Sequence, residues 1–408
     1  MKEVMDVYRE IQNPIFAKSQ ISEVHWNKNV LFVNPQLNGR HFYKYILPYI
    51  VMFEFDVWGT GITSIEKYKP NKEYEYVDVA LNSRQILWAD YIVFPFTHQD
   101  LKGLFDKVRE INPDIKIVFN VDFNYYILPK KHPLYDEFSS DEIKSNIEDN
   151  IFYSEITLVT NSKLSEYLVD KFKNELNKKR FSDKVSKVEI GTFPILLDTD
   201  IILENIQEES EELEEPEETN KNDNALRVGI VATNYVWEDI NSYKDLFKKA
   251  QEKLGDKIKF VLIGFDGIDN KTEKNCFPEG MNLEIIKPCT IIHYFKQLNN
   301  LNLDLLFIPL RNTEFNQTSE NYNKYLEAGM FEVPIMVYDV FPYSEIIKNG
   351  NNGIILKKKN EFVDKLEFFE GNREELKRMG QSAKELIFTN FIYDKDNLPI
   401  IDKIYYKK

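Results

Sequence analysis

The stretch best suited to chemistry is SENYNKYLEAGM, residues 319–330, where four polar side chains crowd together. Glu320, Asn323 and Glu327 are three and four residues apart, so they would share one face of a helix beginning near 319. Carboxylates and amides on such a face suit binding of sugar or ribose hydroxyls, and Lys324 suits neutralisation of a phosphate. A solvated face is the alternative, because Glu320 and Lys324 also have the spacing of a surface ion pair worth about 0.2–0.5 kcal/mol.

The residues just before this predicted helix favour an anion. The loop RNTEFNQT (311–318) follows a predicted strand, carries Arg311 and Asn316, and leads to Ser319. A helix N-terminus placed after a strand attracts negative charge, because its N–H groups and its dipole point at the ligand. We therefore expect Arg311, Asn316 and Ser319 beside a phosphate group, with Glu320 acting on the reacting part of the ligand.

Further candidates follow predicted strands of the first half. Gly39, in the predicted loop QLNGRHFYKYILP, would let a ligand approach the backbone closely, with Arg40 and His41 beside it, although a plain turn is the alternative. His98, in FTHQD, suits proton transfer near neutral pH or a helix cap. Asp122 suits orientation of a hydroxyl group or general base catalysis, or it simply forms a turn.

In the second half, Asn234 and Gly264 also follow predicted strands, where we expect them near a bound base or diphosphate. No Asp-x-Asp signature stands in a convincing place after a strand, so we predict no catalytic metal and no separate cofactor.

The elements that would position these residues are short apolar strands alternating with helical patterns, which predicts α/β units with parallel sheets. Such sheets bind ligands outside the carboxyl ends of their strands. Ser162 is the predicted N-cap of the helix that follows the fourth strand. The predicted strands span 29–35, 89–96, 115–123, 155–161 and 187–195, and then 226–233, 258–265, 283–288, 303–310, 333–340 and 353–358.

The run ENIQEESEELEEPEETNKNDNA (204–225) carries like charges and almost no apolar residues, so it cannot contribute to a core. It predicts a linker between two α/β domains. We assign 1–195 to the first domain, 196–225 to the acidic linker, 226–390 to the second domain and 391–408 to a segment that packs back on the first.

The composition of the chain limits the classes of partner that we expect it to bind. The net charge of −15 and the lack of a dense basic patch argue against nucleic acid. Two cysteines without metal spacing fit a reducing compartment, and no apolar run approaches the ~20 residues of a membrane helix. We expect a cytoplasmic protein without a transmembrane segment; peripheral contact with a membrane stays compatible with this composition.

One long run resembles a known family. The sequence FNQTSENYNKYLEAGMFEVPIMVYDVFPYSEIIKNGNNGIIL (315–356) resembles the C-terminal signature of retaining GT-B glycosyltransferases of bacterial group 1, similar to family 4. That signature joins a polar loop, a Lys-x-x-Glu-Ala helix, a Pro-led strand and Tyr-x-x-x-Ile-x-x-Gly-x-x-Gly. In the first half, 115–135 and 155–168 resemble segments of the same superfamily.

The resemblance implies two Rossmann-like domains facing each other across a cleft. The C-terminal domain would hold a nucleotide sugar, UDP- or GDP-linked, and the N-terminal domain would bind a glycan, lipid-linked or protein acceptor. Glu327 matches the glutamate that holds the donor ribose, and Lys324 matches the lysine beside the diphosphate.

The sequence departs from the family at two points. Eight positions before Glu327, where the family has a second glutamate, stands Ser319. Either the loop has slipped by one residue, so that Glu320 serves, or the acid is lost. The basic pair that many members carry after the first strand of the second domain is also missing, and we expect Arg311 and Lys324 to replace it.

These observations predict a nucleotide-sugar-dependent glycosyltransferase of glycan biosynthesis, acting with retention. A catalytically silent GT-B scaffold that binds sugars or partners an active transferase is one alternative, and a sugar-nucleotide epimerase is another.

Overall fold

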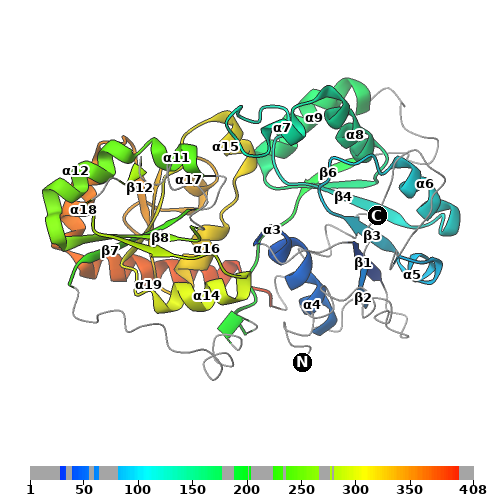
Figure 1. The fold of residues 1–408 in the computed structure, drawn as a ribbon. Helices are drawn as coiled ribbons and strands as arrows, with labels where there is room; N and C mark the ends of the chain where they lie inside the picture. Colours follow the sequence, from blue (N-terminus) through cyan, green and yellow to red (C-terminus); the bar gives the residue numbers. More distant parts are fainter. Residues whose placement is uncertain are drawn as a thin grey trace. The chain divides into compact units, whose positions relative to one another are not determined.

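The computed structural model describes residues 28–33, 39–54, 59–63, 81–176, 188–200, 202–203, 224–232, 236–265, 276–277 and 280–394. The chain divides into two compact units, Met1–Ile201 together with Tyr393–Lys408, and Ile202–Ile392. Each unit is built on one parallel six-stranded sheet with helices packed around it (Figure 1). The predicted α/β class with two Rossmann-like domains is therefore confirmed. Most of the predicted acidic linker lies outside the described residues.

The first unit has the strand order β2-β1-β3-β4-β5-β6, and all of its strand pairs are parallel. The five strands predicted for this half are present. The sixth, β2, was not predicted, because its sequence GTGIT contains two glycines and only one large apolar residue. The strands are β1 (Asn29–Val33), β2 (Gly59–Thr63), β3 (Tyr91–Phe94), β4 (Lys116–Val121), β5 (Ile156–Val159) and β6 (Glu189–Thr192).

Two predictions about the helices of the first unit were wrong. The predicted loop around Gly39 is helical: it forms α3 (Gly39–His41), a π-helix η1 (Phe42–Ile46) and α4 (Leu47–Glu54). Long apolar and aromatic side chains continue through this stretch and bury it. The other helices are α5 (Ser83–Trp88), α6 (Lys102–Ile111), α7 (Tyr135–Phe138), α8 (Asp141–Phe152) and α9 (Ser162–Leu176).

The second correction concerns the start of α9. Ser162 is its first residue, and the cap is Asn161, whose Oδ1 accepts a hydrogen bond from the Leu164 backbone N–H at 2.9 Å. Asn and Ser are both good capping residues. The preceding strand, β5, ends at Val159, so Asn161 can adopt the N-cap position.

At the other end of the chain, the Tyr393 backbone N–H donates to the Leu197 carbonyl at 2.8 Å, so this residue joins the first unit. Residues 395–408 of the predicted returning segment lie outside the described residues.

The second unit has the strand order β12-β11-β10-β7-β8-β9, again with all pairs parallel. All six strands predicted for this half are present, each somewhat shorter than expected. They are β7 (Leu226–Val231), β8 (Ile258–Ile263), β9 (Leu283–Ile286), β10 (Leu305–Ile308), β11 (Ile335–Tyr338) and β12 (Ile354–Leu356).

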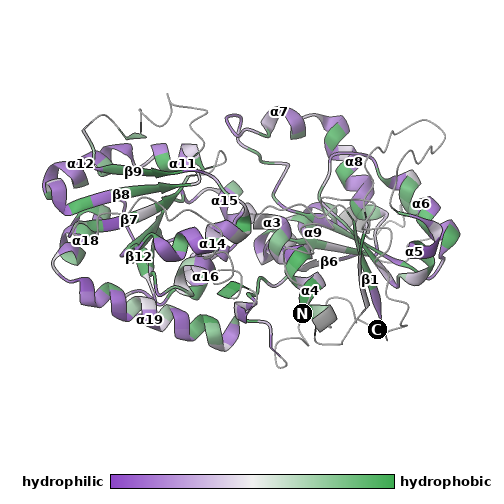
Figure 2. Ribbon diagram, turned by 60° about the horizontal axis from the view of Figure 1, so that its bottom comes forward, coloured by the Kyte–Doolittle hydropathy of each residue, from purple (hydrophilic) through white to green (hydrophobic). Residues whose placement is uncertain are grey.

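Helices cover both faces of this sheet (Figure 1). Alternate residues of the strands pack with α12, α18 and the first turns of α19 into one buried cluster. The helices α14 and α16 and the rest of α19 run along the opposite face (Figure 1). Figure 2 shows the corresponding division of hydropathy: the strands are largely hydrophobic, and the surrounding helices mix hydrophobic and hydrophilic residues. The helices are α11 (Trp237–Asn241), α12 (Lys244–Leu254), the 3-10 turn η3 (Gly255–Lys257), α14 (Ile291–Asn300), α15 (Glu314–Ser319), α16 (Asn323–Gly329), α17 (Tyr343–Ile346), α18 (Glu361–Glu370) and α19 (Arg373–Asn390).

Two glycines let α16 and the turn after it approach α19 closely. A Cβ at Gly380 would lie 1.8 Å from the Glu332 carbonyl oxygen, and a Cβ at Gly329 would lie 2.5 Å from Ile387 Cδ1. The glycines therefore set the position of α16 against α19.

Among the described residues, we find no helix with the length and apolar character needed to span a bilayer.

We predict that Gly380→Ala destabilises the second unit by about 1–3 kcal/mol, because the methyl group would overlap a backbone carbonyl that must move. Gly371→Ala is the matched control, since its Cβ would meet its nearest neighbour at 3.9 Å. Urea unfolding of both variants measures the difference. Equal unfolding midpoints for the two variants would contradict the close approach.

Candidate functional site

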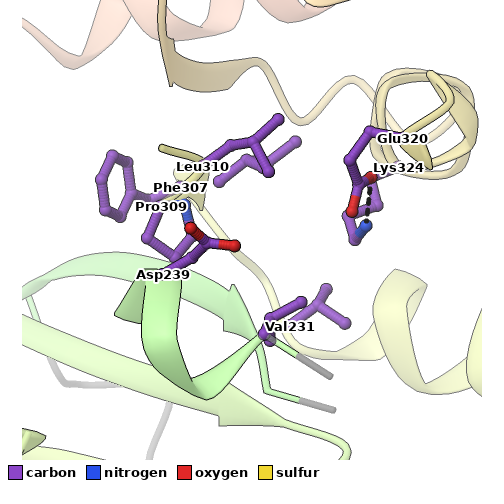
Figure 3. A pocket seen from close by; sticks show the side chains of 9 residues that line it. Val231, Asp239, Phe307, Pro309, Leu310, Glu320 and Lys324 are labelled. Atoms are coloured by element: carbon purple, nitrogen blue, oxygen red, sulfur yellow. Dashed lines mark hydrogen bonds and ion pairs between the residues drawn. The ribbon is translucent and has the colours of Figure 1, made fainter. Parts of the chain in front are cut away.

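A pocket lies where the strand order of the second sheet reverses. From β7 the chain proceeds to β8 and β9 on one side, and from β10 it proceeds to β11 and β12 on the other. The loops that leave the carboxyl ends of β7 and β10 therefore diverge, and ligands of open α/β sheets bind in the space between such loops. The pocket is lined by Val231, Val236, Asp239, Phe307, Ile308, Pro309, Leu310, Glu320 and Lys324 (Figure 3).

Two charged side chains form one wall of this pocket. Lys324 Nζ lies 3.4 Å from Glu320 Oε2, and Figure 3 shows the pair across the pocket from Asp239. The side chains are only 17% and 22% exposed, so the pair is not on a fully solvated face. Lys324 is therefore placed where a bound anion would meet a positive charge, with Glu320 beside it.

The helix predicted near Ser319 is in fact two helices. Thr313 caps α15 by accepting from the Asn316 backbone N–H at 3.1 Å, and α15 ends at Ser319. Glu320 follows with extended backbone, φ −86° and ψ 152°, and α16 begins at Asn323. Glu320 thus does not share a helical face with Glu327, and Ser319 ends a helix where an N-terminus was expected. Because Thr313 caps a helix that begins at Glu314, the segment forms two short helices instead of one continuous helix that begins near 319.

Glu327 is buried, 3% exposed, and each of its carboxylate oxygens accepts a hydrogen bond. Asn323 Nδ2, one turn earlier on α16, donates to Oε1 at 2.7 Å. The Tyr294 hydroxyl, on α14, donates to Oε2 at 3.2 Å. Sequence analysis missed Tyr294, because a residue 33 positions away on another helix leaves no signal in local spacing. Asn323 and Glu327, both predicted, do meet.

Arg311 and Asn316 belong to a network around Asp239. Arg311 Nε lies 2.5 Å from Asp239 Oδ1, and its Nη2 lies 3.1 Å from Glu238 Oε2. Asn316 Nδ2 donates to the same Asp239 carboxylate at 3.1 Å and to the Arg311 carbonyl at 2.9 Å. Burial raises the pKa of Asp239, and the hydrogen bonds from Arg311 act in the opposite direction. The charge of Arg311 is thus already compensated by two carboxylates.

Lys359 is a cation that sequence analysis did not select. Its Nζ donates to Ser242 Oγ at 2.9 Å and lies 4.6 Å from the centroid of the Tyr243 ring. Burial lowers the pKa of Lys359, and the positive charge of Arg311 lowers it further. A second cation therefore stands near Arg311, on the segment after β12.

Gly264 follows β8 with φ +81°, a backbone conformation that favours glycine, and its N–H donates to the Ile286 carbonyl at 2.9 Å. It serves as the predicted turn after the strand. Asn234 lies outside the described residues.

In the first unit, the strand order diverges between β1 and β3, and an ion pair lies near that point. Lys44, on the π-helix η1, places Nζ 2.7 Å from Asp122 Oδ1, and the two side chains are only 5% and 9% exposed. Thr160 Oγ1 donates to the Asp122 carbonyl at 2.6 Å. The ion pair holds the carboxylate in place, and such a fixed group suits the role of hydrogen-bond acceptor better than that of general base. Lys44 was missed because its segment was predicted to be a loop.

The other candidates of this unit have separate surroundings. His98 Nδ1 lies 2.8 Å from Glu137 Oε1, and both side chains are partly exposed. His41 is buried, with its ring 4.7 Å from that of Tyr45. Gly39 and Arg40 form the start of α3, and the Arg40 side chain is outside the described part of the chain.

The fold and the site define a class of protein: two doubly wound α/β units, with a ligand pocket at the point where the strand order reverses. Residues 211–386 match the family model of group 1 glycosyl transferases. This match covers most of the second unit, which contains the pocket.

Solved structures share this fold at low sequence identity. The Anabaena protein HepE in complex with UDP and glucose is 12% identical with a TM-score of 0.60, and the alignment covers 93% of this chain and 100% of that one. The Thermosynechococcus elongatus sucrose-phosphate synthase is 8% identical with a TM-score of 0.56, over 93% and 98%. An apo structure of OtsA is 10% identical with a TM-score of 0.59, over 94% and 100%. No curated protein sequence gives a significant match.

We predict that Lys44→Met destabilises the first unit by about 3–5 kcal/mol, because it leaves the Asp122 carboxylate buried without its counter-ion. The double variant Lys44→Met with Asp122→Leu should recover part of this loss, since the buried carboxylate is then removed as well. Urea unfolding measures both. A double variant no more stable than the single one would mean that the pair does not carry the effect.

Proposed function

We propose that this protein is a glycosyltransferase that moves a sugar from a UDP- or GDP-linked donor to a hydroxyl group of a glycan, lipid-linked or protein acceptor, with retention at the anomeric carbon. The second unit binds the donor, and the first unit binds the acceptor. Glu327 accepts hydrogen bonds from the ribose hydroxyls, with Asn323 beside it, and Lys324 lies beside the diphosphate.

The observation that carries this proposal is the arrangement of Glu327 and Lys324 within the segment that matches the family model. Glu327 is buried with both oxygens held, and Lys324, three residues earlier, lines the pocket at the carboxyl ends of β7 and β10. Similar structures support the donor class, because HepE has been solved in complex with UDP and glucose and in complex with UDP-glucose.

Transfer requires stabilisation of negative charge on the leaving phosphate as the glycosidic bond breaks. A fixed cation near that oxygen lowers the barrier because it needs no reorganisation during the reaction. We assign this role to Lys324, supported by Arg311 and by the polar residues Asn316, Ser319 and Glu320 at the same edge. Asn234 and Gly264 are assigned to the base side of the donor.

On the acceptor side, we assign orientation of the incoming hydroxyl to Asp122, since the ion pair with Lys44 holds its carboxylate in place. His98 remains the candidate for proton transfer, and Gly39, Arg40 and His41 are proposed to contact the acceptor. The proposal needs no metal ion or separate cofactor, because lysine and arginine supply the positive charge.

A second candidate is a silent scaffold that binds sugar nucleotides without turnover. The observation that favours it is the pairing of both expected phosphate-binding cations, Lys324 with Glu320 and Arg311 with Asp239 and Glu238. A site whose cations are already compensated attracts a diphosphate less strongly than one with free positive charge.

We predict slow release of nucleoside diphosphate when the protein is incubated with a panel of UDP- and GDP-sugars without acceptor, because water can replace the acceptor hydroxyl. Chromatography of the nucleotides measures the release. Binding without turnover would favour the scaffold, and conversion to another nucleotide sugar would identify an epimerase.

We also predict that Glu327→Gln weakens binding of the donor nucleotide at least about tenfold, as expected for hydrogen bonds to a charged group. Asp122→Asn should leave that affinity nearly unchanged, because Asp122 belongs to the acceptor side. Glu345→Gln is the control, because Glu345 is an exposed glutamate of the second unit, which also contains Glu327. Calorimetric titration measures all three, and equal losses for Glu327 and Asp122 would refute this division of roles.

A further inference from the structure

Two of the groups that hold Glu327 come from different parts of the chain. Asn323 is on the same helix, one turn away, whereas Tyr294 is on α14, a helix whose N-terminus is capped by Thr290. The Tyr294 hydroxyl reaches Oε2 at 3.2 Å while Asn323 reaches Oε1 at 2.7 Å. These hydrogen bonds, one on each oxygen, fix the orientation of the carboxylate group.

A buried carboxylate needs such donors. An ionised group removed from water loses a large solvation energy unless hydrogen bonds replace it, and Glu327 is 3% exposed. Burial, and after it the negative charge of Glu327, raises the pKa of Tyr294 well above its ordinary value. The phenol therefore keeps its proton throughout the neutral range and remains a donor to Glu327.

We propose that Tyr294 is a positioning residue for the nucleotide-sugar donor: it orients the Glu327 carboxylate so that this group accepts hydrogen bonds from the ribose hydroxyls. This inference rests on the proposed function. Tyr294 does not itself touch the substrate; it acts by limiting the rotation of the glutamate side chain, because the oxygen that it holds cannot turn away without losing the hydrogen bond.

A purely structural role would have a different signature. If Tyr294 only satisfied a buried charge, its loss would loosen the second unit and lower the affinity for every nucleotide alike. If it orients the ribose-binding carboxylate, its loss would affect only nucleotides whose ribose carries hydroxyl groups. Comparing a nucleotide with its dideoxy analogue separates the two, since both ligands meet the same folded protein.

The experiment measures binding of UDP, of GDP and of their 2′,3′-dideoxy analogues to the full chain by calorimetric titration, using the base that the wild type binds more tightly. We expect Tyr294→Phe to weaken binding of the ribonucleotide about three- to tenfold, the loss typical of one net intramolecular hydrogen bond. Binding of the dideoxy analogue should stay within about twofold of wild type.

Tyr243→Phe is the matched control. It removes a hydroxyl from a buried tyrosine of the same unit, and among the described residues that hydroxyl has no hydrogen-bond partner. Tyr243→Phe should change neither the affinity for the ribonucleotide nor the affinity for its dideoxy analogue. Equal losses for both nucleotides in Tyr294→Phe, or no loss for either, would overturn the positioning role while leaving the proposed function intact. A wild type that binds no nucleotide, or does not distinguish ribose from dideoxyribose, would instead overturn the role of Glu327 itself, and the inference with it.

Discussion

The reversal of strand order between β7 and β10 is the constraint on which the second unit depends. Because the connections from these adjacent strands lead to opposite sides of the sheet, their loops separate at the carboxyl ends. Val231 and Leu310 lie on the two sides of that separation, and α16 presents Lys324 to it. The close packing of α16 against α19, made possible by glycines at both contacts, fixes where that lysine lies. Backbone topology and helix packing together therefore create the pocket.

A second constraint is the cost of burying charge. Three of the buried carboxylates in the described residues show how this cost is met: Glu327 is matched by an amide and a phenol, Asp239 by Arg311 and Asn316, and Asp122 by Lys44. Buried ionised groups persist only with such partners. The same pairing that stabilises the folded chain also holds these groups in defined orientations, which is what binding and catalysis require of them.

Much of the fold could be predicted. The apolar runs that became β1, β3, β4 and the strands of the second sheet are visible as hydrophobic segments bounded by turns, because strands buried on both faces must be apolar. The strand β2 escaped prediction because two glycines interrupt its apolar character. The helix predicted from residue 319 was wrong in its start, since one helix begins at Glu314, the next begins at Asn323, and Glu320 lies between them.

The sequence by itself determined the α/β class, the two repeated sets of strands and the group of residues from 311 to 327 at the edge of the second sheet. These depend on periodicity, turn residues and motif order, all of which act over a few neighbouring positions. Only the tertiary structure decided which groups hold the buried charges: Tyr294 for Glu327, Asp239 for Arg311 and Lys44 for Asp122. These partners are separated by 33, 72 and 78 positions. No local pattern can specify them, because their meeting depends on how whole strands and helices pack.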